Sequence, residues 1–223
     1  MTSMVTSAPE SGSQRRRART WLFNPFHYLA GVRALALGVV CILTTGLVGA
    51  WGRSHFDGVL DFHVGASAPV WIFLAEGIIA WLTLSVLLAA TGKLVSRTHV
   101  RSVDVFGTQA LARAPMLLTA IAALLPGYGR FASALMLMQA KLTSWGIPKP
   151  HFDVADAAAF GIVILVTLTM LVWMVALMYR AYAVSCNVKG GRAVISFIVA
   201  LVLAEAASKT TLYVIFRAFV PTA

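Results

Sequence analysis

Two charged residues, Glu205 and Lys209, interrupt a segment that is otherwise apolar enough to cross a membrane, residues 193–217. A helix of ~20 residues spans the ~30 Å hydrocarbon core of a bilayer. A lone charge at that depth costs at least ~2.5–3.5 kcal/mol, so both residues need partners. They stand four positions apart with the glutamate first, the favourable order for an ion pair on one helix face. A row of small residues on this helix predicts close approach of a second helix: Ala200, Ala204 and Ser208.

A third charge, Glu76, falls in another apolar segment at a similar predicted depth. With ~1.5 Å of rise per residue, Glu76 and Lys209 both lie ~6 Å outward of the membrane midplane. We therefore predict an intramembrane network of Glu76, Lys209 and Glu205, extended by the hydroxyls of Ser208 and Thr211. Such a network either fixes the register of two helices or lines a path for a substrate, an ion or a proton.

Imidazoles and carboxylates occur together in two connecting segments, and both groups bind zinc and other divalent metals. The first loop, residues 51–67, contributes His55, Asp57, Asp61 and His63; the segment before the fourth apolar run contributes His151, Asp153 and Asp156. Their spacing matches no standard ligand motif, and an ordinary polar loop has the same composition. A metal-dependent enzyme would require the two segments to converge, and the sequence favours neither a metal nor another cofactor.

Polar residues also surround the start of the third apolar run, at residues 104–115. This stretch is interpreted either as a buried elbow at the membrane surface or as a surface that docks a partner together with the loop at 180–192. The candidate docking residues are Asp104, Gln109, Arg113, Arg180, Lys189 and Arg192.

Sequence signatures of enzymes are missing from the chain. It contains no HExxH, GxSxG, P-loop or CxxC motif. We therefore expect a protein that is not an enzyme.

The overall composition indicates a membrane protein. The chain is 59% hydrophobic and 12% charged, whereas soluble domains are about 25% charged. Because backbone groups in lipid must be satisfied internally, apolar runs of this length predict helices. We predict an all-α integral membrane protein with a disordered basic tail at 1–22, a membrane domain at 23–223, and five spans at about 29–50, 68–90, 110–125, 157–179 and 193–217. Residues 130–142 are apolar but too short to span, so they predict an interfacial or re-entrant helix.

Lysine and arginine set the predicted orientation. They concentrate in the tail, the second loop and the fourth loop, which places the N-terminus in the cytoplasm and the C-terminus outside. The net charge of +10 lies beside apolar spans, as topology signals do, so we expect no nucleic-acid partner. We predict a multi-pass protein of the cell's inner membrane, whose partners are the bilayer and either another membrane protein or further copies of itself.

Two stretches resemble the Yip domain family of Ypt/Rab-interacting membrane proteins and its prokaryotic relatives: DVFGTQALARAPMLLTAIAALLP and YRAYAVSCNVKGGRAVISFIVALVLAE. The likeness runs from about residue 23 to the C-terminus and includes the Asn24-Pro25-Phe26 turn. It implies five spans, a cytoplasmic N-terminus and, from the eukaryotic members, a role in vesicle trafficking with Rab-type GTPases and hetero-oligomers. The N-terminal tail is short and basic here, which argues against GTPase binding, and no catalytic residues carry over.

Two functions follow. The favoured one is a non-enzymatic scaffold or partner-binding protein in membrane organisation. The alternative is a small transporter or channel that uses Glu76, Glu205 and Lys209. A transporter needs water to reach the acidic residues, whereas a scaffold needs them dry and paired.

Overall fold

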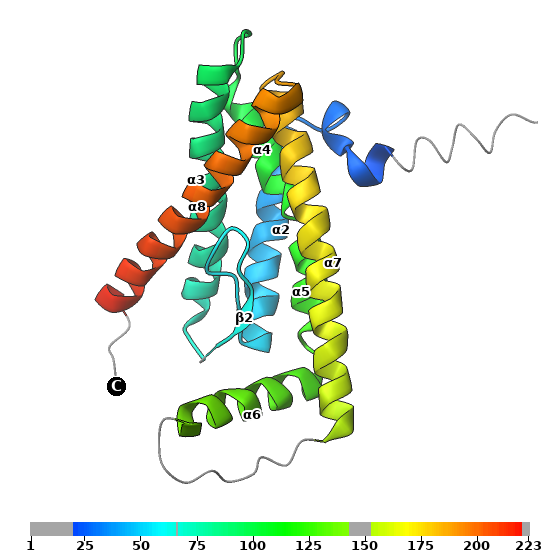
Figure 1. The fold of residues 1–223 in the computed structure, drawn as a ribbon, viewed down its shortest axis with the longest axis vertical. Coiled ribbons are helices and arrows are strands. Elements are labelled where there is room, and N and C mark those ends of the chain that lie inside the picture. Colours follow the sequence, from blue (N-terminus) through cyan, green and yellow to red (C-terminus); the bar gives the residue numbers. More distant parts are fainter. Residues whose placement is uncertain (1–19, 66, 143–152, 220–223) are drawn as a thin grey trace, which may run out of the picture.

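The molecule is a bundle of long helices with a small hairpin and a crosswise helix at one end (Figure 1). The computed structural model describes residues 20–65, 67–142 and 153–219. Within them, five helical segments are long and apolar enough to cross a membrane: α2 (Gly31–Gly52), α3 (Val70–Val95), α4 with α5 (Ser102–Ala122), α7 (Val154–Ser185) and α8 (Gly190–Phe219). The prediction of an all-α membrane protein with five spans is confirmed.

The third and fourth spans differ most from their predicted ranges. The third begins at Ser102 instead of 110, because its polar first turns hide the helix from a hydropathy criterion. The fourth continues to Ser185 instead of 179, so the predicted loop at 180–192 shrinks to residues 186–189. At the other end of the chain, residues 20–23 are helical and precede a short 3-10 helix, η1 (Pro25–His27), so three residues of the predicted disordered tail have regular structure.

The third span is interrupted at its middle, between α4 (Ser102–Ala112) and α5 (Pro115–Ala122). Pro115 has no N–H to continue the helical hydrogen bonds. The chain tightens instead, with Arg113 N–H donating to the Ala110 carbonyl at 3.2 Å and Ala114 N–H to the Leu111 carbonyl at 3.1 Å. Arg113 therefore lies midway along the span and not in its first turns, where the sequence placed it.

Helix α6 (Pro126–Leu142) corresponds to the helix predicted at 130–142. It runs crosswise to the long helices at one end of the bundle, which is the direction expected of an interfacial helix (Figure 1). Residues 126–129, which include Pro126, Gly127 and Gly129, form the first turn of this helix. Proline is well suited to a first helical turn, where its missing N–H has no intrahelical acceptor.

Small residues bring the spans into close contact. A Cβ on Gly38 of α2 or on Gly107 of α4 would collide with the backbone of the other helix, so these two helices touch main chain to main chain. Helix α8 packs on α3. Its predicted row of small residues is fully buried, as expected: Ala200, Ala204 and Ser208.

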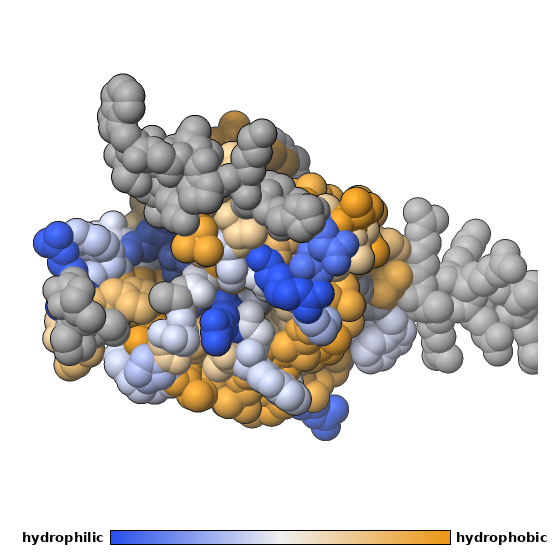
Figure 2. All heavy atoms as spheres, turned by 90° about the horizontal axis from the view of Figure 1, so that it is seen from below, coloured by the Kyte–Doolittle hydropathy of each residue, from blue (hydrophilic) through white to orange (hydrophobic). Residues whose placement is uncertain are grey.

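The two ends of the bundle differ. The hairpin end carries strands β1 (Ser54–His55) and β2 (His63–Val64) and helix α6. Seen from that end, hydrophilic residues gather near the centre and hydrophobic ones cover the flanks (Figure 2). The basic end carries the connections 96–101 and 186–189. Its exposed cations are Lys93, Arg97, Arg101, Arg180, Lys189 and Arg192.

Candidate functional site

The connection between α2 and α3 folds back into the bundle as a re-entrant hairpin, residues 54–64 (Figure 1). β1 and β2 pair antiparallel only at its base, with Ser54 opposite Val64 and His55 opposite His63. Beyond this ladder, Phe56 and Val59 are buried in the main core. The sequence had placed this segment as an outer loop, since its alternation of polar and apolar residues gives no sign of insertion.

Ionisable side chains of three spans serve the backbone of the hairpin where the ladder stops. Phe56 N–H donates to Glu76 Oε2 of α3 at 2.9 Å, and Leu60 N–H donates to Glu205 Oε2 of α8 at 2.9 Å. The guanidinium of Arg113 donates to the Gly58 carbonyl at 3.5 Å and interacts electrostatically with Glu205. Arg113 and Glu205 lie near the middle of their spans, so the hairpin tip reaches mid-bundle. Irregular backbone at membrane depth requires such partners inside the protein.

Glu76 is the most enclosed of these groups. Its side chain has no exposed surface, and its Oε1 lies 2.7 Å from His55 Nδ1, whose side chain is also buried. The imidazole of His55 stacks on Phe73 at 4.4 Å between ring centroids and on His63 at 5.5 Å. The carboxylate thus fixes both the histidine and the first turn of the hairpin.

The predicted pairing of Glu76 with Lys209 is wrong. Lys209 Nζ lies 2.5 Å from Asp61 Oδ2 and 3.4 Å from Glu205 Oε1, while Glu76 binds His55 and Phe56. The glutamate and the lysine were predicted at a common depth, but each finds a partner in the hairpin instead: His55 and Phe56 for Glu76, and Asp61 for Lys209. The i, i+4 contact of Glu205 with Lys209 is present.

The predicted extension of the network through hydroxyl groups is also wrong. Ser208 Oγ donates to the carbonyl of Glu205 at 3.1 Å, and Thr211 Oγ1 donates to the carbonyl of Ala207 at 2.8 Å. Both acceptors are backbone carbonyl groups of α8 itself. These hydrogen bonds therefore stay within one helix and do not extend the charged network.

Gly58 lets the tip of the hairpin approach α8. A Cβ at this position would lie 2.5 Å from Glu205 Oε1. That carboxylate is already held by the Leu60 N–H and by Lys209. Glycine at 58 is therefore required for the contact between the hairpin and the middle of α8.

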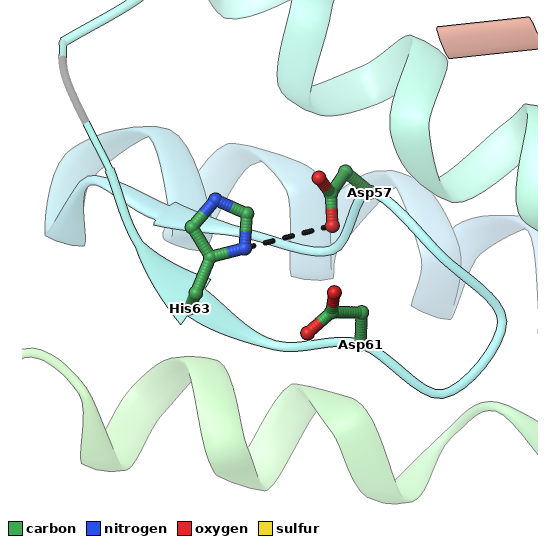
Figure 3. Close-up of side chains that lie close together, drawn as sticks. All are labelled: Asp57, Asp61 and His63. Carbon is green, nitrogen blue, oxygen red and sulfur yellow. Dashed lines mark ion pairs between the residues drawn. The ribbon is translucent and has the colours of Figure 1, made fainter. Parts of the chain in front are cut away.

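Three potential metal ligands of the hairpin lie close together: Asp57, Asp61 and His63 (Figure 3). One ligand atom from each lies within 4.8 Å of the others, and His63 Nδ1 is 3.5 Å from Asp57 Oδ1. Their chemistry suits a divalent cation. However, the ammonium group of Lys209 already neutralises Asp61, so a cation would have to displace it.

The two aspartates of this cluster differ in acidity. Burial raises the pKa of Asp57 above its usual range, and the opposing charge of His63 does not cancel that effect. Burial acts on Asp61 in the same direction, but the hydrogen bond and the positive charge of Lys209 outweigh it and lower the pKa of Asp61. Asp61 is therefore the stable anion of the pair.

The remaining metal candidates do not join this cluster within the described residues. His55 turns to Glu76, and His151 lies outside the described residues. Asp153 caps α7 by accepting from Ala155 N–H at 3.0 Å, and Asp156 pairs with Arg130. The convergence of the two acidic segments that a metal-dependent enzyme would require is thus not observed in the described part of the chain, because the second segment starts α7 and holds α6.

The predicted docking residues separate into buried and exposed groups. Gln109 is fully buried and donates to the Met178 carbonyl at 3.0 Å, and Arg113 is only 5% exposed, so neither can dock a partner on the surface. Asp104 is half-buried, 3.8 Å from Arg101. The exposed candidates all lie at the basic end: Arg180, Lys189 and Arg192.

The role of Arg113 in holding the hairpin was missed in the sequence. Its signal is a charged residue followed two positions later by a proline inside an apolar run, which marks a mid-span break with a buried charge.

Comparison of the chain with protein-family models, with curated proteins and with solved structures finds no match.

Proposed function

We propose that the protein is a non-enzymatic, multi-pass membrane protein that acts as a scaffold or partner-binding protein in membrane organisation. One observation carries the proposal: Glu76, Arg113 and Glu205 all hydrogen-bond to the backbone of the hairpin. A carrier or channel needs intramembrane ionisable groups that its substrate can reach. Here these groups serve the protein's own main chain.

The closed interior supports the same function. The cavity beside Arg113, lined also by Thr45, Phe56 and Met116, has a volume of about 10 Å³. That is room for about one water molecule. Glu76 has no exposed surface at all. A dry, internally paired bundle suits a scaffold.

The proposed partner surface is the basic end, through Arg180, Lys189 and Arg192, with a second membrane protein or another copy as the partner. The resemblance to the Yip domain family and the charge pattern of the loops add to this proposal. On the same grounds we place the basic end in the cytoplasm and the protein in the cell's inner membrane.

Thiol labelling tests whether the interior is dry. In a background with Cys41→Ala and Cys186→Ala, the variants Ser85→Cys and Thr45→Cys place a near-isosteric thiol at buried positions of α3 and α2. Ser67→Cys, at an exposed position of the hairpin end, is the matched control. With a charged methanethiosulfonate reagent in intact membranes, we expect the buried thiols to react at least ~100-fold more slowly than the control.

Rapid labelling at position 45 or 85 would instead support the alternative, a transporter or channel. The observation that favours this alternative is the exposure of Lys209, whose side chain is 46% exposed beside Asp61. If the thiols are protected, a photocrosslinker at position 180 should capture the partner in intact membranes. The control is a crosslinker at position 172, where Val172 is 72% exposed on the flank of α7; equal products from both positions would count against a partner at the basic end.

A further inference from the structure

A groove runs between the end of α3 and the start of α8 at the basic end, remote from the hairpin. Its apolar part has a volume of about 500 Å³ and is lined by Leu94, Ile195 and Val199. A polar hollow of about 390 Å³ adjoins it, lined by Arg97 and Lys189. Val95 and Arg192 line both, so the two hollows are neighbours on one surface.

The apolar part opens on the flank of the bundle that faces lipid. Leu94 is 85% exposed, Ile195 67% and Val199 49%. An aliphatic surface of this kind at membrane depth is covered by acyl chains. Two residues with hydroxyl groups, Thr91 and Ser196, also line this part.

The polar part is lined by three cations, Arg97, Lys189 and Arg192. Among the residues that the structure describes, no aspartate or glutamate lines either hollow. Among residues 20–65, 67–142 and 153–219, no acid forms an ion pair with Arg97, Lys189 or Arg192. Three cations at the mouth of an apolar groove complement a ligand with one anionic group and a hydrocarbon tail.

We propose that this groove binds one anionic phospholipid. Its phosphate lies against Arg97, Lys189 and Arg192, and an acyl chain lies along Leu94, Ile195 and Val199. Basic clusters beside a membrane span attract anionic headgroups, and guanidinium groups bind phosphate oxygens through paired hydrogen bonds. The groove adds a fixed place for the chain, which a flat basic surface lacks.

The test uses the full chain purified in a neutral detergent. Phosphatidylglycerol or phosphatidylcholine of equal chain length is added, and lipid adducts are counted by native mass spectrometry while the midpoint of thermal unfolding is followed. We expect one saturable adduct with phosphatidylglycerol, an increase in the midpoint, and at least ~10-fold weaker apparent binding of phosphatidylcholine.

Two variants separate the groove from the general charge of this end. The triple variant Arg97→Gln, Lys189→Gln, Arg192→Gln should weaken phosphatidylglycerol binding by at least ~10-fold. Lys93→Gln removes an exposed cation that lines neither hollow and should bind as the wild type does. Val199→Trp fills the apolar part from an exposed position and should weaken binding while the charges remain.

Three results would overturn the proposal. One is equal phosphatidylglycerol binding by the wild type and the triple variant. Another is an equal loss of binding in Lys93→Gln. The third is saturation of the site by inorganic phosphate, with no further gain from the acyl chain, which would assign the hollow to a free phosphate group instead of a lipid.

Discussion

Charged residues at the two ends of the bundle have opposite surroundings. At the hairpin end, Glu76 and His55 are buried against each other, and Arg113 and Glu205 bind backbone groups of the hairpin. At the basic end, Arg97, Lys189 and Arg192 are exposed and lie around an open groove. The charged groups of the hairpin end bind the protein's own backbone. Within the described residues, the three cations of the basic end form no ion pair with an acid.

The difference follows from what each end must satisfy. An irregular hairpin in an apolar bundle carries N–H and C=O groups that water cannot reach, so ionisable side chains replace the missing strand partners. The connections at the basic end are short and lie at the surface, where water can serve their backbone. Charge at the hairpin end should therefore govern stability, and charge at the basic end should govern binding.

The largest effect is expected for Glu76→Ala. The change leaves the Phe56 N–H and the buried His55 without their acceptor. Leaving a buried hydrogen-bonding group without its partner costs ~1–3 kcal/mol, and this change leaves two such groups. We expect this loss in the free energy of unfolding, measured by SDS titration in mixed micelles.

Asp104→Ala is the control for that prediction, since Asp104 lies 3.8 Å from Arg101 in a loose pair and the arginine side chain is 70% exposed. Its loss should stay below ~1 kcal/mol. If Glu76→Ala does not fold, Glu76→Gln, which keeps one acceptor, should fold and remain less stable than the wild type. Equal stability of Glu76→Gln, Asp104→Ala and the wild type would remove the distinction between the two ends.

A smaller loss is expected for Gly58→Ala. The added methyl group would lie 2.5 Å from Glu205 Oε1 and push that carboxylate off the Leu60 N–H. Overpacking of this kind costs ~1–3 kcal/mol, measured by the same titration. Gly161→Ala is the matched control, because a Cβ there meets nothing within 4 Å and lies in helix α7. It should be neutral or stabilising by up to ~1 kcal/mol, and a similar loss in both variants would contradict the close contact at Gly58.

Much of this architecture could be predicted because it is local in sequence. Span length and apolar character identify five helices, and the Ala200–Ala204–Ser208 row correctly marks the face of α8 that packs on α3. The i, i+4 spacing brings Glu205 and Lys209 together on one helix. Each of these properties depends on helical periodicity alone.

The partners of Glu76 and Arg113 could not be predicted in the same way. Depth along a span is read from the sequence, but the direction of a side chain around its helix depends on what packs there. The hairpin that packs there is held by contacts to three separate spans. Arg113 and Gln109 were candidates for a docking surface as well as for a buried elbow, because polar residues lower hydropathy and do not show which way a side chain faces. Both are buried in the bundle.

A weak coupling is expected between Asp61 and Lys209, an exposed ion pair of the hairpin end. Their side chains are 34% and 46% exposed. Exposed pairs contribute ~0.2–1 kcal/mol. A double-mutant cycle of Asp61→Asn and Lys209→Gln should give a coupling energy in that range, whereas several kcal/mol would place this pair with the buried ones.

The smallest effect is expected at the basic end. In neutral detergent without anionic lipid, each of the changes Arg97→Gln, Lys189→Gln and Arg192→Gln should alter the free energy of unfolding by no more than ~0.5 kcal/mol, as surface substitutions usually do. The side chains are exposed and form no ion pair with an acid in the described part of the chain. The same SDS titration measures this change in the free energy of unfolding.

A loss of several kcal/mol in any single variant would mean that these cations stabilise the fold as Glu76 does. Unchanged stability means that their charge is left for a ligand, because nothing in the folded bundle then depends on it.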